Sequence, residues 1–183
     1  MEIKRYIKPL RFLIIGLVLY VGWVFLHEGL LKPERIIDPW LTNIVSEHSV
    51  GILNLMGYEI EQFKMPEYGN RIISGTGTGL LRIAHLCNGL ELYVIFAIFL
   101  LAFPGSWKNK VWFIPVGFVI IYLVNLIRVI SLILIQMYHP DYLQFNHKYT
   151  FVIIVYGVIF GLWVVWVKFF GRPVTDRRRK AEA

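Results

Sequence analysis

Residues 86–137 read LCNGLELYVIFAIFLLAFPGSWKNKVWFIPVGFVIIYLVNLIRVISLILIQM, which are two long apolar runs joined by a short basic loop. The first run ends at Pro104-Gly105, and the second continues to Met137. A helix needs about 20 apolar residues to cross the hydrocarbon core of a bilayer. The two runs therefore predict a helical hairpin that crosses a membrane twice.

Two further apolar runs lie outside this hairpin, near the two ends of the chain. Hydrophobic residues make up 57% of the 183 residues, against roughly 45–50% in soluble domains. No small-residue cleavage site follows the first run, so we expect it to be retained as a helix. The sequence predicts one polytopic membrane domain over residues 1–183, with spans at about 10–26, 86–103, 111–137 and 149–170.

Basic residues flank these spans on one side. They fall in the N-terminal segment, the loop Gly105–Lys110 and the C-terminal tail. Four spans place these three segments together, and the positive-inside rule makes that side cytoplasmic. We therefore expect cytoplasmic termini, with loops 27–85 and 138–148 outside. The formal net charge of +7 then meets anionic lipid head groups, and nucleic acid is not an expected partner. The basic residues that flank the spans are Lys4, Arg5, Lys8, Arg11, Lys108, Lys110, Lys168, Arg172 and Arg177–Lys180.

The outer loop 27–85 has structure of its own. Asp38-Pro39 is typical of a helix start, and an amphipathic helix in the membrane interface is expected after it. Residues 58–63 and 70–74 alternate in polarity before a glycine-rich turn, which favours a small β-hairpin or meander that leads to Cys87. The predicted fold is an all-α membrane bundle of about four helices, with an outer interfacial helix and this hairpin. The apolar face of the predicted interfacial helix comprises Trp40, Leu41, Ile44, Val45, Ile52, Leu55 and Met56, and its opposite side carries Thr42, Asn43, Ser46 and Glu47.

Arg128 lies inside the third predicted span, about nine residues, or roughly 13 Å, from its outer end. An arginine at depth costs at least ~2.5–3.5 kcal/mol, so it is expected to face the protein interior and to have a partner. Asn125 lies three residues earlier on the same helix face. Arg128 is a functional candidate, and a purely structural tie between helices is the alternative.

Cys87 is the one cysteine of the chain, so no intramolecular disulfide can form. A lone cysteine is usually a small buried hydrophobe. The surrounding HLCNGLE segment is polar and contains glycine, however, and it lies at the outer end of the second span within the outward reach of Arg128. These features favour a reactive thiol.

His147 precedes the fourth span on the same outer side, and histidine transfers protons near neutral pH. Cysteine chemistry needs a thiolate, a proton shuttle and a group that stabilises negative charge. Cys87, His147 and Arg128 supply these from three different helices. His85 is a reserve candidate for the histidine. Glu91, four residues after Cys87, is hypothesised to pair with Arg128.

In these motifs the chain resembles the exosortase/archaeosortase family of membrane transpeptidases. The resemblance rests on Cys87-Asn88-Gly89 opening one span, on Asn125 to Arg128 inside the next, and on His147 leading into the last. It covers about residues 81–170 and is nearest to the short bacterial members, although longer relatives have more helices.

The resemblance implies that Cys87 is the nucleophile, that His147 is the acid and base, and that Arg128 stabilises the thiolate or oxyanion. The expected substrates are exported proteins with a C-terminal sorting tail, made of a short motif, a transmembrane helix and a basic cluster. Cleavage through a thioacyl intermediate would occur at the outer face of the bacterial cytoplasmic membrane. Asn88, Gly89, Glu91 and Asn125 are supporting candidates.

Two other interpretations stay open. One is a non-enzymatic assembly or transport component in which Arg128 and Glu91 are structural. The other is a membrane acyltransferase that uses Cys87 on lipid substrates. No metal or cofactor is expected, because one cysteine and scattered histidines lack ligand spacing and no nucleotide-binding motif is present.

Overall fold

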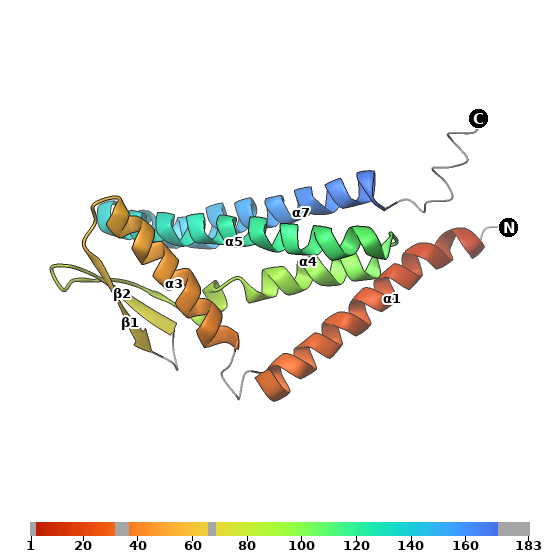
Figure 1. Ribbon diagram of the computed structural model, residues 1–183, viewed down its shortest axis with the longest axis horizontal. Helices are drawn as coiled ribbons and strands as arrows, with labels where there is room; N and C mark the ends of the chain where they lie inside the picture. Colours follow the sequence, from red (N-terminus) through yellow and green to blue (C-terminus); the bar gives the residue numbers. More distant parts are fainter. Residues whose placement is uncertain (1–2, 32–36, 66–68, 172–183) are drawn as a thin grey trace.

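The computed structural model describes residues 3–31, 37–65 and 69–171. Helices α4, α5 and α7 run side by side along the long axis, and α1 packs against α4 (Figure 1). A small sheet and α3 lie beside the end of α5. The helices are α1 (Ile3–Leu26), α3 (Ile37–Leu55), α4 (Leu90–Ala102), α5 (Trp107–Tyr138), α6 (Leu143–Phe145) and α7 (Phe151–Phe169); the short turns are η1 (His27–Leu31), η2 (His85–Cys87), η3 (Pro140–Tyr142) and η4 (Asn146–Thr150); the strands are β1 (Ile60–Met65), β2 (Gly69–Ser74) and β3 (Gly79–Ile83).

Three helical segments of the described chain are long and apolar enough to cross a membrane: Leu10–Gly29, Trp107–Tyr138 and Pro140–Phe169. The second predicted span is shorter than expected. Its helix α4 has 13 residues, or about 20 Å, against a hydrocarbon core of about 30 Å. A 3₁₀ turn precedes it and a left-handed Gly89 begins it, so residues 86–89 do not extend the helix. Four membrane-spanning helices are therefore not confirmed.

The predicted hairpin is part of a larger element, a three-stranded antiparallel sheet in the order β1-β2-β3. Phe63 of β1 lies opposite Arg71 of β2, which lies opposite Arg82 of β3. No residue range was predicted for the third strand. Its last residue, Ile83, is 2% exposed and packs with buried residues of the other two strands.

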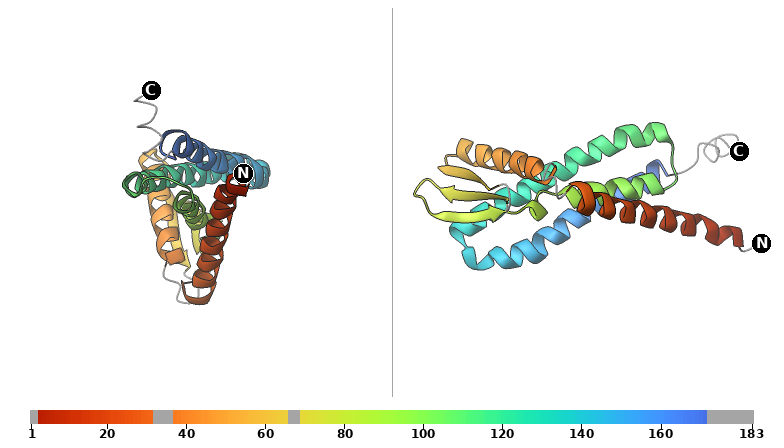
Figure 2. Two further views of the ribbon diagram at one scale, coloured as in Figure 1. Left: turned by 90° about the vertical axis from the view of Figure 1, so that its right-hand side faces the viewer. Right: turned by 90° about the horizontal axis from the view of Figure 1, so that it is seen from below.

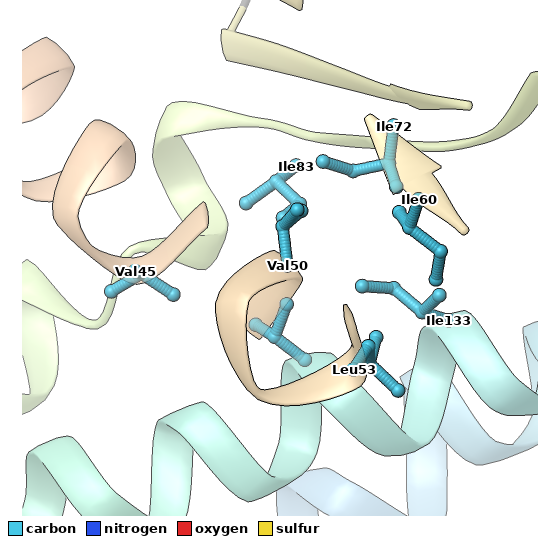
Figure 3. Close-up of a cluster of buried hydrophobic side chains, with 8 residues drawn as sticks. Val45, Val50, Leu53, Ile60, Ile72, Ile83 and Ile133 are labelled. Carbon is cyan, nitrogen blue, oxygen red and sulfur yellow. The ribbon is translucent and has the colours of Figure 1, made fainter. Parts of the chain in front are cut away.

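Two hydrophobic cores are arranged along α5. The bundle core joins α4, α5 and α7 and includes Phe113 and Ile121 of α5. The outer core joins α3, the sheet and the last part of α5, including Val129 and Ile133 (Figure 3). The two polar candidate residues of α5, Asn125 and Arg128, lie between these cores. The remaining members are Leu92, Phe96, Leu100, Val155, Ile159 and Trp166 in the bundle core, and Val45, Val50, Leu53, Ile60, Ile72 and Ile83 in the outer core.

Helix α3 forms where an amphipathic interfacial helix was predicted, but the side that it packs against the protein includes polar residues that the prediction placed opposite the apolar face. Thr42 and Ser46, assigned to the polar side, are fully buried. Trp40 and Leu55, assigned to the apolar side, are 62% and 90% exposed. The reason is that α3 packs against α5 and the sheet, where Val45 enters the outer core.

The start of α1, the α4–α5 turn and the end of α7 lie at one end of the molecule, while the sheet and the α5–α7 turn lie at the other (Figures 1 and 2). This arrangement fits the prediction that the basic segments share one side. Lys110 at the start of α5 is buried, and its Nζ donates to the carbonyl oxygens of Leu101 and Phe103 at 3.0 and 2.9 Å. It therefore caps the end of α4. The basic tail Arg177–Lys180 lies outside the described residues.

Gly117 allows α5 to approach α4, because a Cβ there would collide with the ring of the buried Phe96. We expect Gly117→Ala to lower the free energy of unfolding by about 1–3 kcal/mol through overpacking. Unfolding of the detergent-solubilised protein measures this. Gly161→Ala on α7 is the matched control, because a Cβ there meets no atom within 4 Å and alanine favours a helix over glycine. Equal stability of the two variants would contradict the proposed packing.

Candidate active site

Cys87 lies on a tight turn that connects the sheet to the bundle. It ends η2, and Gly89 follows with φ +88° and ψ 4° as the residue before α4. Residues with side chains rarely adopt this left-handed conformation. A Cβ at Gly89 would also lie 3.2 Å from Nδ2 of Asn125. Glycine at this position therefore permits both the turn and its close contact with α5.

The structure brings Cys87, Arg128 and His147 together. Sγ of Cys87 lies 3.6 Å from Nε2 of His147, and Nη2 of Arg128 lies 3.3 Å from the same nitrogen. A guanidinium has donors only, so Nε2 accepts from it and the proton of the neutral imidazole is on Nδ1. The Nε2 lone pair thus faces both the thiol and the cation. The three residues come from η2, α5 and η4.

Asn125 attaches the Cys87 turn to α5. Its side chain is fully buried, and Nδ2 lies 3.3 Å from the carbonyl oxygen of Cys87 and 3.2 Å from that of Asn88. Asn125 and Arg128 are three residues apart and so share a helix face. One face of α5 therefore holds the backbone of the cysteine and also presents the cation to the histidine.

Asn88 connects the turn to α3 and α4. It is 1% exposed, and its Oδ1 accepts from the backbone N–H of Leu90 at 2.8 Å, in the first turn of α4. Its Nδ2 donates to Oδ1 of Asp38 at 2.9 Å. The other carboxylate oxygen of Asp38 lies 2.9 Å from Nε2 of His27. This chain of contacts reaches from the end of α1 to the candidate nucleophile.

Sequence reasoning did not assign His27 and Asp38 to the site. Asp38 was interpreted only as part of a helix start, and His27 was given no role. The sequence shows an acid and a histidine in one outer loop, and this was the signal that could have suggested the contact. Whether the two side chains meet depends on the position of α3 in the fold. The reserve candidate His85 has its Nδ1 3.0 Å from Oγ1 of Thr42, and this hydroxyl oxygen also lies 3.5 Å from Nδ2 of Asn88.

The hypothesised ion pair between Glu91 and Arg128 does not form among the described residues. Both residues line one hollow of about 170 Å³ between α4, α5 and α7, but Glu91 is exposed. The hypothesis was motivated by two otherwise unpaired charges in apolar helices, and Glu91 was also predicted to share a helix face with Cys87. The left-handed Gly89 separates η2 from α4. Cys87 and Glu91 therefore do not share a helix face.

A groove of about 490 Å³ opens onto the candidate nucleophile. It lies between β3 on one side and α5, α6 and η4 on the other. Most of its side chains are apolar, which is typical of a binding site with a few placed polar groups. It is lined by Leu80, Leu81, Arg82, Ile83, Cys87, Val129, Leu132, Leu143, Gln144, His147 and Lys148.

A comparison with protein families identifies the chain. The model of the transmembrane exosortase family matches residues 3–169. The chain belongs to this family. Membership supports a membrane transpeptidase at the level of the family, and the match includes α1, α3 and the sheet, beyond the region of the predicted resemblance. No curated protein and no solved structure matches the chain. Within the residues described for this exosortase-family protein, no cluster of three His, Cys, Asp or Glu side chains could hold a metal ion.

Asp38 should stabilise this exosortase-family protein through its contacts with Asn88 and His27. We expect Asp38→Ala to lower the free energy of unfolding by about 1–3 kcal/mol, because it leaves a buried amide donor of Asn88 poorly paired. Thermal unfolding in detergent measures the loss. Asp141→Ala, at an exposed acid on the α5–α7 turn, is the matched control and should have little effect. A loss of the same size in both variants would show that the Asp38 contacts are not important.

Proposed function

We propose that this protein is a membrane cysteine transpeptidase that cleaves the C-terminal sorting tails of exported proteins through a thioacyl intermediate. The observation that carries the proposal is that Sγ of Cys87 and Nη2 of Arg128 lie 3.6 and 3.3 Å from Nε2 of His147. This arrangement occurs in a chain of the transmembrane exosortase family.

In the first step, Nε2 of His147 takes the proton of the Cys87 thiol. The sulfur then attacks the carbonyl carbon of the scissile peptide bond, and the carbonyl electrons move onto its oxygen. When this oxyanion collapses, the C–N bond breaks and the imidazolium gives its proton to the leaving nitrogen. The products are a thioester on Cys87 and the released tail.

Arg128 has a separate role in this scheme. Its Nη2 donates to Nε2 of His147 while that nitrogen is unprotonated. After proton transfer this hydrogen bond is lost, because Nε2 now carries hydrogen. The guanidinium can then donate to the thiolate or to the oxyanion. Such stabilisation of developing charge is often the largest catalytic contribution.

In the second step, an amine, another acceptor or water attacks the thioester carbon. His147 removes the proton of the acceptor, and the C–S bond breaks to restore the thiol. The same histidine therefore acts as base in each attack and as acid in each departure, as microscopic reversibility requires.

The position of Arg128 along α5 supports a site at the outer face of the membrane. It lies 21 residues after Trp107, or about 31 Å along the helix at 1.5 Å per residue. If α5 enters the hydrocarbon near Trp107, Arg128 reaches its far side, since the core is about 30 Å thick. With cytoplasmic termini, the site faces outward, where the cleavage motif of a tail with a basic cytoplasmic end would emerge.

The test is processing of a tailed reporter in cells at matched membrane levels of each variant. We expect Cys87→Ala to abolish tail loss. His147→Ala should slow it by about 10²–10⁴-fold through loss of proton transfer, and Arg128→Ala by about 10²–10³-fold through loss of charge stabilisation. His139→Ala, at an exposed histidine at the end of α5, is the control and should process the tail normally.

A covalent adduct provides a second measurement. Wild-type protein, and not Cys87→Ala, should carry part of the reporter as a thioester that hydroxylamine releases. Normal processing by Cys87→Ala would remove the catalytic assignment and favour the non-enzymatic membrane component.

A further inference from the structure

Strand β3 is at the edge of the sheet. Its neighbour is β2, and the sheet order places no described strand on its other side. In an antiparallel edge strand, alternate residues direct their N–H and C=O groups away from the sheet. Such an edge is a template for pairing with another extended chain, and proteins usually protect it.

The groove at the candidate nucleophile follows this edge. Four consecutive residues, 80–83, line it. Residues 81–83 pair in regular register with β2, next to a bulge at residue 80. Successive side chains in such a regular run point to opposite faces of the sheet, so a cavity over one face would contact alternate residues. Contact with every residue in turn indicates a cavity that runs along the backbone edge.

The edge and the nucleophile are continuous in the chain. β3 ends at Ile83, four residues before Cys87, and the same groove contains Cys87 and His147. The opposite wall is formed by Val129 and Leu132 of α5 and by α6 and η4. An extended chain that lies beside β3 in this groove would therefore also lie beside the thiol of Cys87 and the imidazole of His147.

We propose that the extended segment of the sorting tail binds as a fourth strand beside β3, and that this pairing positions its scissile carbonyl at Cys87. The proposal rests on the proposed function, since it assigns the binding mode of the same substrate. Backbone pairing provides affinity that does not depend on the tail's side chains, and pockets for alternate side chains provide selectivity.

The dimensions fit this mode of binding. The five residues of β3 extend about 16 Å at 3.3 Å per residue. A groove of about 490 Å³ lies within the range of roughly 300–1,000 Å³ for ligand sites. Side chains of the bound segment that point away from solvent would contact Leu132 and Leu143, while its backbone pairs with β3.

Cysteine cross-linking tests the pairing, because Cys87→Ala makes the chain cysteine-free and should retain the tail uncleaved. The probe is an exported reporter with a tail that the wild-type protein processes. Arg82→Cys is added to the cysteine-free chain, and one cysteine is placed at successive positions before the membrane anchor of the reporter. We expect disulfide yield to alternate along the tail, high at every second position, because only those side chains lie on the Arg82 face.

Phe63→Cys is the matched control. Phe63 lies in the same cross-strand row as Arg71 and Arg82, but on β1 at the opposite edge of the sheet. It should give no alternating pattern with the tail. A second variant, Leu80→Cys, should shift the pattern along the tail. Thermal unfolding of both β3 variants in detergent, at matched membrane levels, shows that they fold.

The outcomes separate the two proposals. Cys87-dependent cleavage with uniform cross-linking along the tail, or with equal yield from Phe63→Cys, overturns the strand pairing and leaves the proposed function standing. Alternating cross-links with cleavage that does not need Cys87 retain the strand site and overturn the catalytic assignment.

Discussion

The buried amide of Asn125 is the interaction on which the site depends. It donates to two carbonyl oxygens of the Cys87 turn and so fixes the start of α4 against the middle of α5. A buried carbonyl without a donor costs about as much as a lost hydrogen bond, and the left-handed turn leaves these two outside the regular ladder of a helix. Gly89 and Asn125 therefore depend on each other, because the glycine allows the close approach and the amide satisfies the groups that the turn exposes.

The location of this interaction follows from the fact that α5 contributes to both hydrophobic cores. Its first half packs in the bundle core with α4 and α7, and its last part packs in the outer core with α3 and the sheet. Polar side chains are costly inside either core unless they are paired. They are accommodated at the boundary, where α4 begins and the sheet ends. The Asp38, Asn88 and Asn125 contacts occupy this boundary and connect it to the end of α1 through His27.

The candidate chemistry is located at the open side of the same boundary. Asn125 and Asn88 are almost fully buried, whereas His147 is exposed and Cys87 is partly exposed. The side chains that hold the turn are thus packed, and the side chains that would react face the groove. This division suits a site in which backbone geometry is fixed before a substrate arrives. It also explains why the short α4 matters, since a helix continued back to residue 86 would place Cys87 within the helix and remove the turn.

The sequence alone determined the membrane helices, the motifs and the identity of the candidate residues. Length and hydropathy identified the regions of α1, α5 and α7 because the bilayer imposes a minimum apolar run. The cost of an arginine in lipid made Arg128 stand out without any knowledge of its neighbours. The cysteine turn, the asparagine before the arginine and the final histidine together indicated the family, which the match over residues 3–169 confirmed.

Only the tertiary structure decided how these parts meet. Helix periodicity fixes which residues share a face of one helix, but not the rotation of that helix against its neighbours. For this reason the sequence could name Cys87, Arg128 and His147 without placing the thiol and the guanidinium beside Nε2 of the histidine, and it assigned Glu91 to a pairing with Arg128 that does not form among the described residues. The buried polar face of α3, the contacts of Asp38 and the edge of β3 beside the candidate nucleophile depend on contacts between segments far apart in the chain. Such contacts are set by packing of the whole molecule, and no local pattern encodes them.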